Sequence, residues 1–130
     1  RILEEVDFVS IGTNDLTQYT MAADRMSAEL ATLTDPWQPG VLTLIGMTGR
    51  AGQAVGKPVG VCGEAAADPL LACVLVGLGV TSLSAASAAV NAVGAKVASV
   101  TADQCREAAD AVLRTASSAE ARAVALAVLG

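Results

Sequence analysis

The sequence predicts an α/β protein built from parallel βα units, on three observations. Short β-branched runs alternate with longer segments whose apolar residues recur at helical spacing, and the connections between them are short. Glycine closes several of these segments, as is typical of turns between strands and helices. Hydrophobic residues make up 53% of the 130 residues, but only one Phe, one Trp and one Tyr are present. The elements must therefore pack through small side chains and close backbone approach, and their alternation favours a parallel sheet.

The first βα unit is expected near the start of the chain. Residues 6–11 are β-branched and predict a buried strand, and residues 12–15 predict a tight polar turn. Residues 16–23 then predict a helix. Asn14 or Asp15 is expected to be its N-cap, because a short polar side chain can accept hydrogen bonds from the free N–H groups of the first turn.

The second unit is expected after a long connection. Residues 24–40 contain two Pro residues and Gly40, which predict a loop, and residues 41–55 predict a helix lying close against a sheet. Residues 59–62 predict a second strand ending in a turn. Asp68 precedes a proline and is expected to cap a helix over residues 70–78.

The third unit and two further helices complete the pattern. Residues 81–84 predict a weak third strand, and residues 85–97 predict a helix. Residues 101–104 and 117–120 each match a capping box, so we expect a helix to begin after each. A full barrel of eight βα units needs about 250 residues. The chain, which also starts in mid-pattern at Arg1, is therefore expected to be a piece of a longer protein.

Composition excludes several classes of function. The formal charge is −5 and the sequence isoelectric point is near 4.5, which argues against a nucleic-acid partner. No apolar run reaches the length of a membrane span. Three cysteines without metal-type spacing and without a secretory signal predict a reducing cytoplasm. The chain has no histidine and supplies no histidine chemistry itself.

Polar residues follow the predicted strands at their carboxyl ends, where parallel α/β folds place their sites. Asn14 and Asp15 follow the first strand, and Cys62 and Glu64 end the second. Asn14 and Asp15 are either helix caps or groups that hold a divalent cation and an anion. Cys62 is either a small buried residue or a thiol acid or nucleophile. Glu64 is either solvated or tunes that thiol. Arg25 is either a surface ion-pair residue or an anion clamp.

Four other residues are expected to serve in packing rather than in a site. Cys73 and Cys105 are expected to be small buried apolar residues. Trp37 and Tyr19 are expected to be packing residues as well.

Two segments resemble signatures of the phosphoenolpyruvate (PEP)-utilising enzymes. The run Ser-Ile-Gly-Thr-Asn-Asp-Leu-Thr-Gln-Tyr-Thr, continuing to Asp24-Arg25, resembles the first signature. Val61-Cys62-Gly63-Glu64, followed by Ala67-Asp68-Pro69, resembles the second. Within that superfamily the Tyr19-Thr20 ending is most similar to Enzyme I of the bacterial phosphotransferase system. Pyruvate phosphate dikinase and PEP synthase are similar but usually differ around that tyrosine.

This resemblance implies a fold and a set of residue roles. Residues 1–130 would be a single partial domain: the C-terminal part of a PEP-binding (β/α)₈ barrel, about three βα units plus C-terminal helices. Asp15 would bind Mg²⁺ and substrate, Asn14 would contact the phosphate, and Arg25 would contact the anion. Cys62 would protonate the enolate carbon as pyruvate forms. Glu64 would help to keep that thiol protonated through like-charge repulsion.

The resemblance also implies a reaction and its partners. The parent protein would transfer the phosphoryl group of PEP to a histidine in its own N-terminal domain and then to HPr, for sugar uptake. It would be a cytoplasmic homodimer with no role for nucleic acid or membrane. The chain alone is expected to be inactive, since the family's phosphate-binding arginines and its second metal carboxylate come from earlier strands. Alternatives are a dikinase or synthase fragment, or a non-catalytic dimerisation module.

Overall fold

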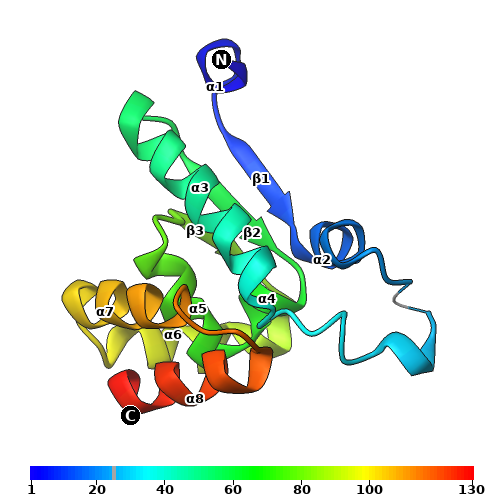
Figure 1. The fold of residues 1–130 in the computed structure, drawn as a ribbon. Helices are drawn as coiled ribbons and strands as arrows, with labels where there is room; N and C mark the ends of the chain where they lie inside the picture. Colours follow the sequence, from blue (N-terminus) through cyan, green and yellow to red (C-terminus); the bar gives the residue numbers. More distant parts are fainter. Residues whose placement is uncertain (25) are drawn as a thin grey trace.

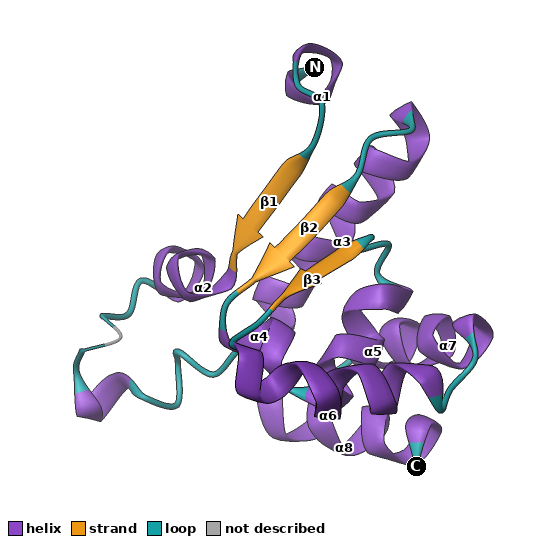
Figure 2. Ribbon diagram, turned by 180° about the vertical axis from the view of Figure 1, so that it is seen from behind, coloured by secondary structure: helices purple, strands orange, loops and turns teal. Residues whose placement is uncertain are grey.

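A three-stranded parallel sheet lies at the centre of the computed structural model, which describes residues 1–24 and 26–130. The strands are β1 (Val9–Gly12), β2 (Val59–Cys62) and β3 (Ser82–Ser84), in the order β1-β2-β3. The register pairs Gly12 with Cys62 and Cys62 with Ser84, so the carboxyl ends of the strands lie side by side (Figure 2). The predicted α/β class with three parallel βα units is confirmed.

Helices follow each strand, and those after residue 68 gather into a cluster (Figure 1). Within the described residues, no helix combines the length and apolar character that crossing a bilayer requires. The helices are α1 (Ile2–Glu5), α2 (Thr13–Met21), the 3₁₀ turn η1 (Ala28–Leu30), α3 (Pro39–Val55), α4 (Glu64–Ala67), α5 (Pro69–Gly77), α6 (Ser87–Ala98), α7 (Ala102–Val112) and α8 (Ser118–Leu129).

The two faces of the sheet differ in burial. Val59 and Val61 are buried, and Val59 lies against the α3 helix, where a side-chain carbon at Gly52 would meet it. The opposite face carries small residues, and Ser10, Gly12, Ser82 and Ser84 are exposed on it. Parallel sheets are normally covered on both faces. The sheet of the described residues is therefore open, and it has the form of one portion of a barrel wall.

The C-terminal helices pack by close backbone approach, as the composition predicts. A side-chain carbon placed at Gly77 of α5 would lie 2.0 Å from the carbonyl oxygen of Cys105 on α7. Cys73 and Cys105 are both buried at this junction, which confirms the prediction that they are core residues.

The start of α2 differs from the prediction. The helix begins at Thr13, with Gly12 as its N-cap, so Asn14 and Asp15 lie within the first turn and do not cap it. The expected polar turn over residues 12–15 is therefore wrong. The chain passes directly from strand to helix at Thr13, whose hydroxyl group bonds to the end of β2, a contact described below.

Of the three caps predicted in the second half of the chain, two are confirmed in full. The Asp68 side chain accepts hydrogen bonds at the start of α5, and Thr101 and Gln104 form a complete capping box at α7. At α8 only half of the predicted box forms: Ser117 accepts from the Glu120 N–H, but the Glu120 carboxylate accepts from Ala116. The extended backbone at Ser117 places the preceding N–H within reach.

Two short helices were not predicted, and one packing prediction fails. Residues 2–5, for which the sequence made no prediction, form α1, and Glu64, expected in a turn with Gly63, begins α4 (Glu64–Ala67). Trp37 is fully buried, as predicted. Tyr19 is 80% exposed, so its predicted packing role is wrong. Thr17 occupies the buried face of α2, and a residue two positions further along a helix points to the opposite side.

Candidate functional site

The ends of β1 and β2 bring three predicted site residues to one hollow. We call residues 12–15 and 62–64 the strand-end site. A hollow of about 260 Å³ is lined by Gly12, Thr13, Asn14, Asp15, Cys62 and Gly63. Asn14 also lines two adjoining hollows of about 370 and 350 Å³, and Glu64 lines both of these. Among the residues that the structure describes, Asn14 is therefore the one that the three hollows share.

Asn14 and Asp15 lie at the N-terminal end of α2. Asn14 is half-buried and Asp15 is exposed. The N-cap residue is Gly12, which has no side chain to accept from the N–H groups of the first turn. These N–H groups and the positive end of the helix dipole therefore face the hollow beside a half-buried amide, an arrangement that suits an anion.

Cys62 is the last residue of β2 and its thiol is half-buried. The Sγ atom donates to the carbonyl oxygen of Ile11 at 3.6 Å, which directs the S–H group across to the end of β1. Gly63 follows with φ at +102°, a backbone conformation that favours glycine. The chain then turns into α4, whose first residue, Glu64, is exposed beside Asn14 and not among the residues that line the Cys62 hollow.

Thr13 belongs to the site, although the sequence patterns did not indicate it. Its side chain is 1% exposed, and its Oγ1 donates to the carbonyl oxygen of Cys62 at 3.0 Å. The hydroxyl therefore joins the two signature segments directly. No local pattern reveals such a contact, because the partner lies 49 residues away in the sequence.

The donor groups of the strand-end site suit a metal ion shared with a bound anion. Among the described residues, no group of three or more His, Cys, Asp or Glu side chains is arranged to hold a metal. Asp15 offers one exposed carboxylate, and Mg²⁺ is commonly bound by one or two carboxylates together with substrate phosphates. Arg25, the predicted anion contact, lies outside the described residues.

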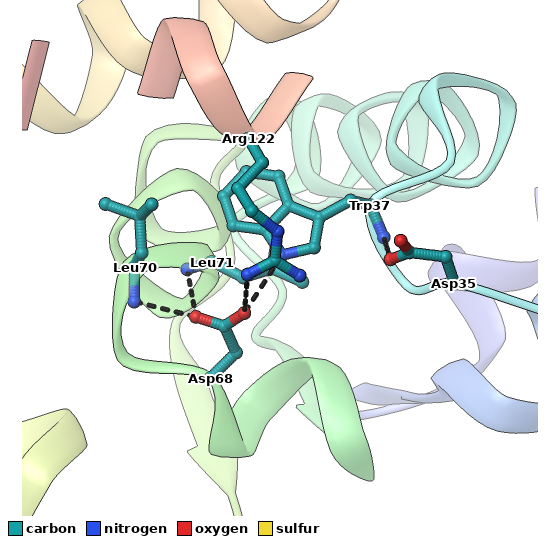
Figure 3. Close-up of polar contacts among 6 residues, drawn as sticks. All are labelled: Asp35, Trp37, Asp68, Leu70, Leu71 and Arg122. Atoms are coloured by element: carbon teal, nitrogen blue, oxygen red, sulfur yellow. Dashed lines mark hydrogen bonds and ion pairs between the residues drawn. The ribbon is translucent and has the colours of Figure 1, made fainter. Parts of the chain in front are cut away.

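Asp68 anchors the segment that follows the strand-end site (Figure 3). Its Oδ1 accepts from the N–H groups of Leu70 and Leu71 at 2.9 and 3.1 Å. Its Oδ2 accepts from Trp37 Nε1 at 2.9 Å and from the Arg122 guanidinium at 3.2 Å. That guanidinium also lies over the indole ring, 5.0 Å from its centroid. One carboxylate thus connects the loop before α3, the start of α5 and the α8 helix.

The three thiols are expected to differ sharply in reactivity. Burial raises the pKa of Cys73 from its usual 9.0 to about 11, with repulsion from Cys105 adding to the effect, and burial also raises the pKa of Cys105. Iodoacetamide at about pH 8 should therefore modify only Cys62 in the folded chain, since the thiolate is the nucleophile. Peptide mapping after timed alkylation measures this. Modification of Cys73 or Cys105 as fast as Cys62 would contradict the structure.

The same pKa shift predicts a loss of stability at alkaline pH. Below pH 9 the Cys73 thiol is protonated in both the folded and the unfolded chain. Between pH 9 and about 11 the unfolded chain releases this proton and the folded chain does not, so rising pH favours unfolding.

Comparisons with known proteins find relatives that match most of the chain. The family model described as PEP-utilising enzyme, PEP-binding domain, matches residues 1–102. A phosphoenolpyruvate-protein phosphotransferase of Streptomyces coelicolor is 56% identical over 128 residues, which cover 98% of this chain and 23% of that protein. The Staphylococcus carnosus phosphotransferase is 39% identical over 117 residues, covering 90% of the chain and 20% of that protein. A multiphosphoryl transfer protein of Rhodobacter capsulatus is 45% identical over 121 residues, covering 93% and 15%. The chain thus spans less than a quarter of the length of these relatives.

Proposed function

We propose that this chain, which belongs to the PEP-utilising enzymes through their PEP-binding domain, is the C-terminal part of the catalytic barrel of a PEP–protein phosphotransferase. Residues 1–130 would form a single partial domain. The observation that carries the proposal is the 56% identity over 98% of the chain to a protein of that name. The gathering of both signature segments around one hollow supports it.

The proposed reaction transfers the phosphoryl group of PEP and releases pyruvate. As the resemblance to Enzyme I implies, the phosphoryl acceptor would be a histidine in the N-terminal domain of the parent protein, which passes the group to HPr; this chain itself holds no histidine. We propose that the parent protein is cytoplasmic and works as a homodimer. Neither nucleic acid nor a membrane has a part in this scheme.

Each residue of the strand-end site has a proposed role. The Asn14 amide and the N–H groups of the first turn of α2 would bind the phosphate. Asp15 would hold Mg²⁺, which when bound neutralises charge on the phosphoryl group. Asp15 and Glu64 are both exposed carboxylates, and together they would repel a bare anion, so a cation is needed between them and the substrate. Arg25 is proposed as a further anion contact.

Cys62 is proposed as the general acid. Its half-buried thiol lines the hollow of the strand-end site and donates a hydrogen bond to the end of β1. When the phosphoryl group leaves, the enolate carbon takes the S–H proton and pyruvate forms. Glu64 is proposed to support this site from the two adjoining hollows, which it lines together with Asn14.

A chimeric enzyme tests the proposal. This chain replaces the 128 matching residues of the Streptomyces coelicolor phosphotransferase, and PEP-dependent pyruvate release is measured with Mg²⁺ and HPr. We expect activity, and we expect Cys62→Ala to lower kcat by about 100-fold or more. Cys73→Ala is the matched control, because Cys73 is a thiol buried away from the hollow, and it should retain activity.

Three outcomes would overturn the proposal or redirect it. A folded but inactive chimera would count against the phosphotransferase function. Pyruvate release that requires a nucleotide instead of HPr would favour a dikinase or synthase. If the isolated chain dimerises while neither Mg²⁺ nor PEP alters the amide signals of Asn14, Asp15 and Cys62, a dimerisation module is favoured.

A further inference from the structure

Two hydrogen bonds cross between the end of β1 and the end of β2 in opposite directions. Thr13 Oγ1 donates to the carbonyl oxygen of Cys62 at 3.0 Å, and Cys62 Sγ donates to the carbonyl oxygen of Ile11 at 3.6 Å. Thr13 directly precedes Asn14, the residue shared by the three hollows. The crossed bonds therefore connect the segment that bears the thiol to the segment that bears the amide and carboxylate.

The surroundings of Thr13 hold its hydroxyl in one place. The side chain is buried, and its own carbonyl oxygen accepts from Thr17 Oγ1 at 2.7 Å, which fixes the first turn of α2. A side-chain carbon at Gly63 would lie only 2.9 Å from Thr13 Oγ1. The hydroxyl thus occupies the space that any other residue at position 63 would need, and a buried hydroxyl without its partner is costly.

We infer that Thr13 is a positioning residue that sets the place of the Cys62 thiol relative to Asn14 and Asp15. Its hydroxyl holds the carbonyl group of Cys62 in place. Because that backbone is fixed, the Cys62 thiol can donate its hydrogen bond to the Ile11 carbonyl oxygen. Without the hydroxyl, the end of β2 would loosen and the thiol would leave this position more often. The hydrogen bonds, and the position of the thiol that they set, do not depend on the proposed function. Only the role of that position in proton transfer rests on it.

Alkylation of the chain itself tests the positioning directly. Iodoacetamide modification of Cys62 is followed by peptide mapping in the natural chain and in Thr13→Val, which keeps the shape and removes the hydroxyl. We expect modification of Cys62 to be about fivefold faster in Thr13→Val, the factor that corresponds to one lost hydrogen bond. Thr13→Ser restores a hydroxyl and should return the rate to about that of the natural chain.

Internal controls distinguish a change in the position of the Cys62 thiol from partial unfolding of the whole chain. Cys73 and Cys105 are buried, so their modification reports opening of the whole chain. Thr115→Val removes a half-buried hydroxyl that bonds locally to the Val112 carbonyl at the end of α7, outside the strand-end site, and it should leave the Cys62 rate unchanged. The inference is wrong if Thr13→Val leaves the Cys62 rate unchanged, or if it accelerates all three thiols equally. If Thr13→Val does not fold, Thr13→Ala is used with the same readout.

The chimeric enzyme then tests the consequence for catalysis. Thr13→Val should lower kcat by about tenfold, because a misplaced acid slows proton transfer, while KM for PEP changes little. Thr13→Ser should restore kcat. Equal loss in both variants, or a change in KM alone, would overturn the positioning role. An inactive parent chimera would instead defeat the proposed function and leave the alkylation result standing.

Discussion

Asp68→Ala is expected to lower the free energy of unfolding by about 3 kcal/mol, although Asp68 lies outside the strand-end site. The substitution removes the N-cap of α5, a loss of about 1 kcal/mol. It also removes the acceptor of the Trp37 indole N–H, and Trp37 is fully buried, so that donor is left without its partner at a further cost of about 1–3 kcal/mol. Urea denaturation of the chain measures the change.

Two matched variants show which part of the Asp68 contacts matters. Arg122 is about half exposed, so its ion pair with Asp68 is screened by water, and Arg122→Met should cost less than about 1 kcal/mol. Asp68→Asn keeps one side-chain oxygen and should fall between the two. If Arg122→Met were as damaging as Asp68→Ala, the ion pair, and not the buried indole hydrogen bond, would hold these segments together.

The elements that the sequence predicted correctly are those specified by nearby residues. The strand over residues 59–62 and the caps at Asp68 and Thr101 depend on β-branched runs or on side chains that reach the next turn. The strand is indicated by its own β-branched residues, and the caps bond to residues two or three positions further along, so local pattern is sufficient. The carboxyl-end location of the site followed in the same way, because parallel strands align their ends.

The parts that local pattern missed depend on partners far away in the sequence. A cap was one of the two roles open to Asn14 and Asp15, but the helix begins earlier, at Thr13, whose hydroxyl bonds to Cys62. Asp68 was predicted only as a cap, and its bond to Trp37 spans 31 positions. Nothing in the spacing of the residues identifies either pair before the chain is folded.

The close approach of the α5 and α7 backbones makes Gly77 the position where a larger side chain is expected to destabilise the chain most. We expect Gly77→Ala to lower the free energy of unfolding by about 3 kcal/mol, at the upper end of the cost of overpacking. The added carbon would lie 2.0 Å from the Cys105 carbonyl oxygen and 2.9 Å from Ala109 Cβ. The first of these atoms belongs to the backbone of α7, so the clash cannot be relieved by rotating a side chain. The whole of α5 or α7 would have to move.

Gly94 provides the matched control, because it is a helical glycine in open space. No atom lies within 4 Å of a side-chain carbon built there, and the residue is exposed on α6. Gly94→Ala should therefore raise the free energy of unfolding by about 0.5–1 kcal/mol, since alanine favours the helix. Paired urea titrations of the two variants measure effects of opposite sign. If both substitutions stabilised the chain, α5 and α7 would not be in backbone contact, and the small-residue core would need another explanation.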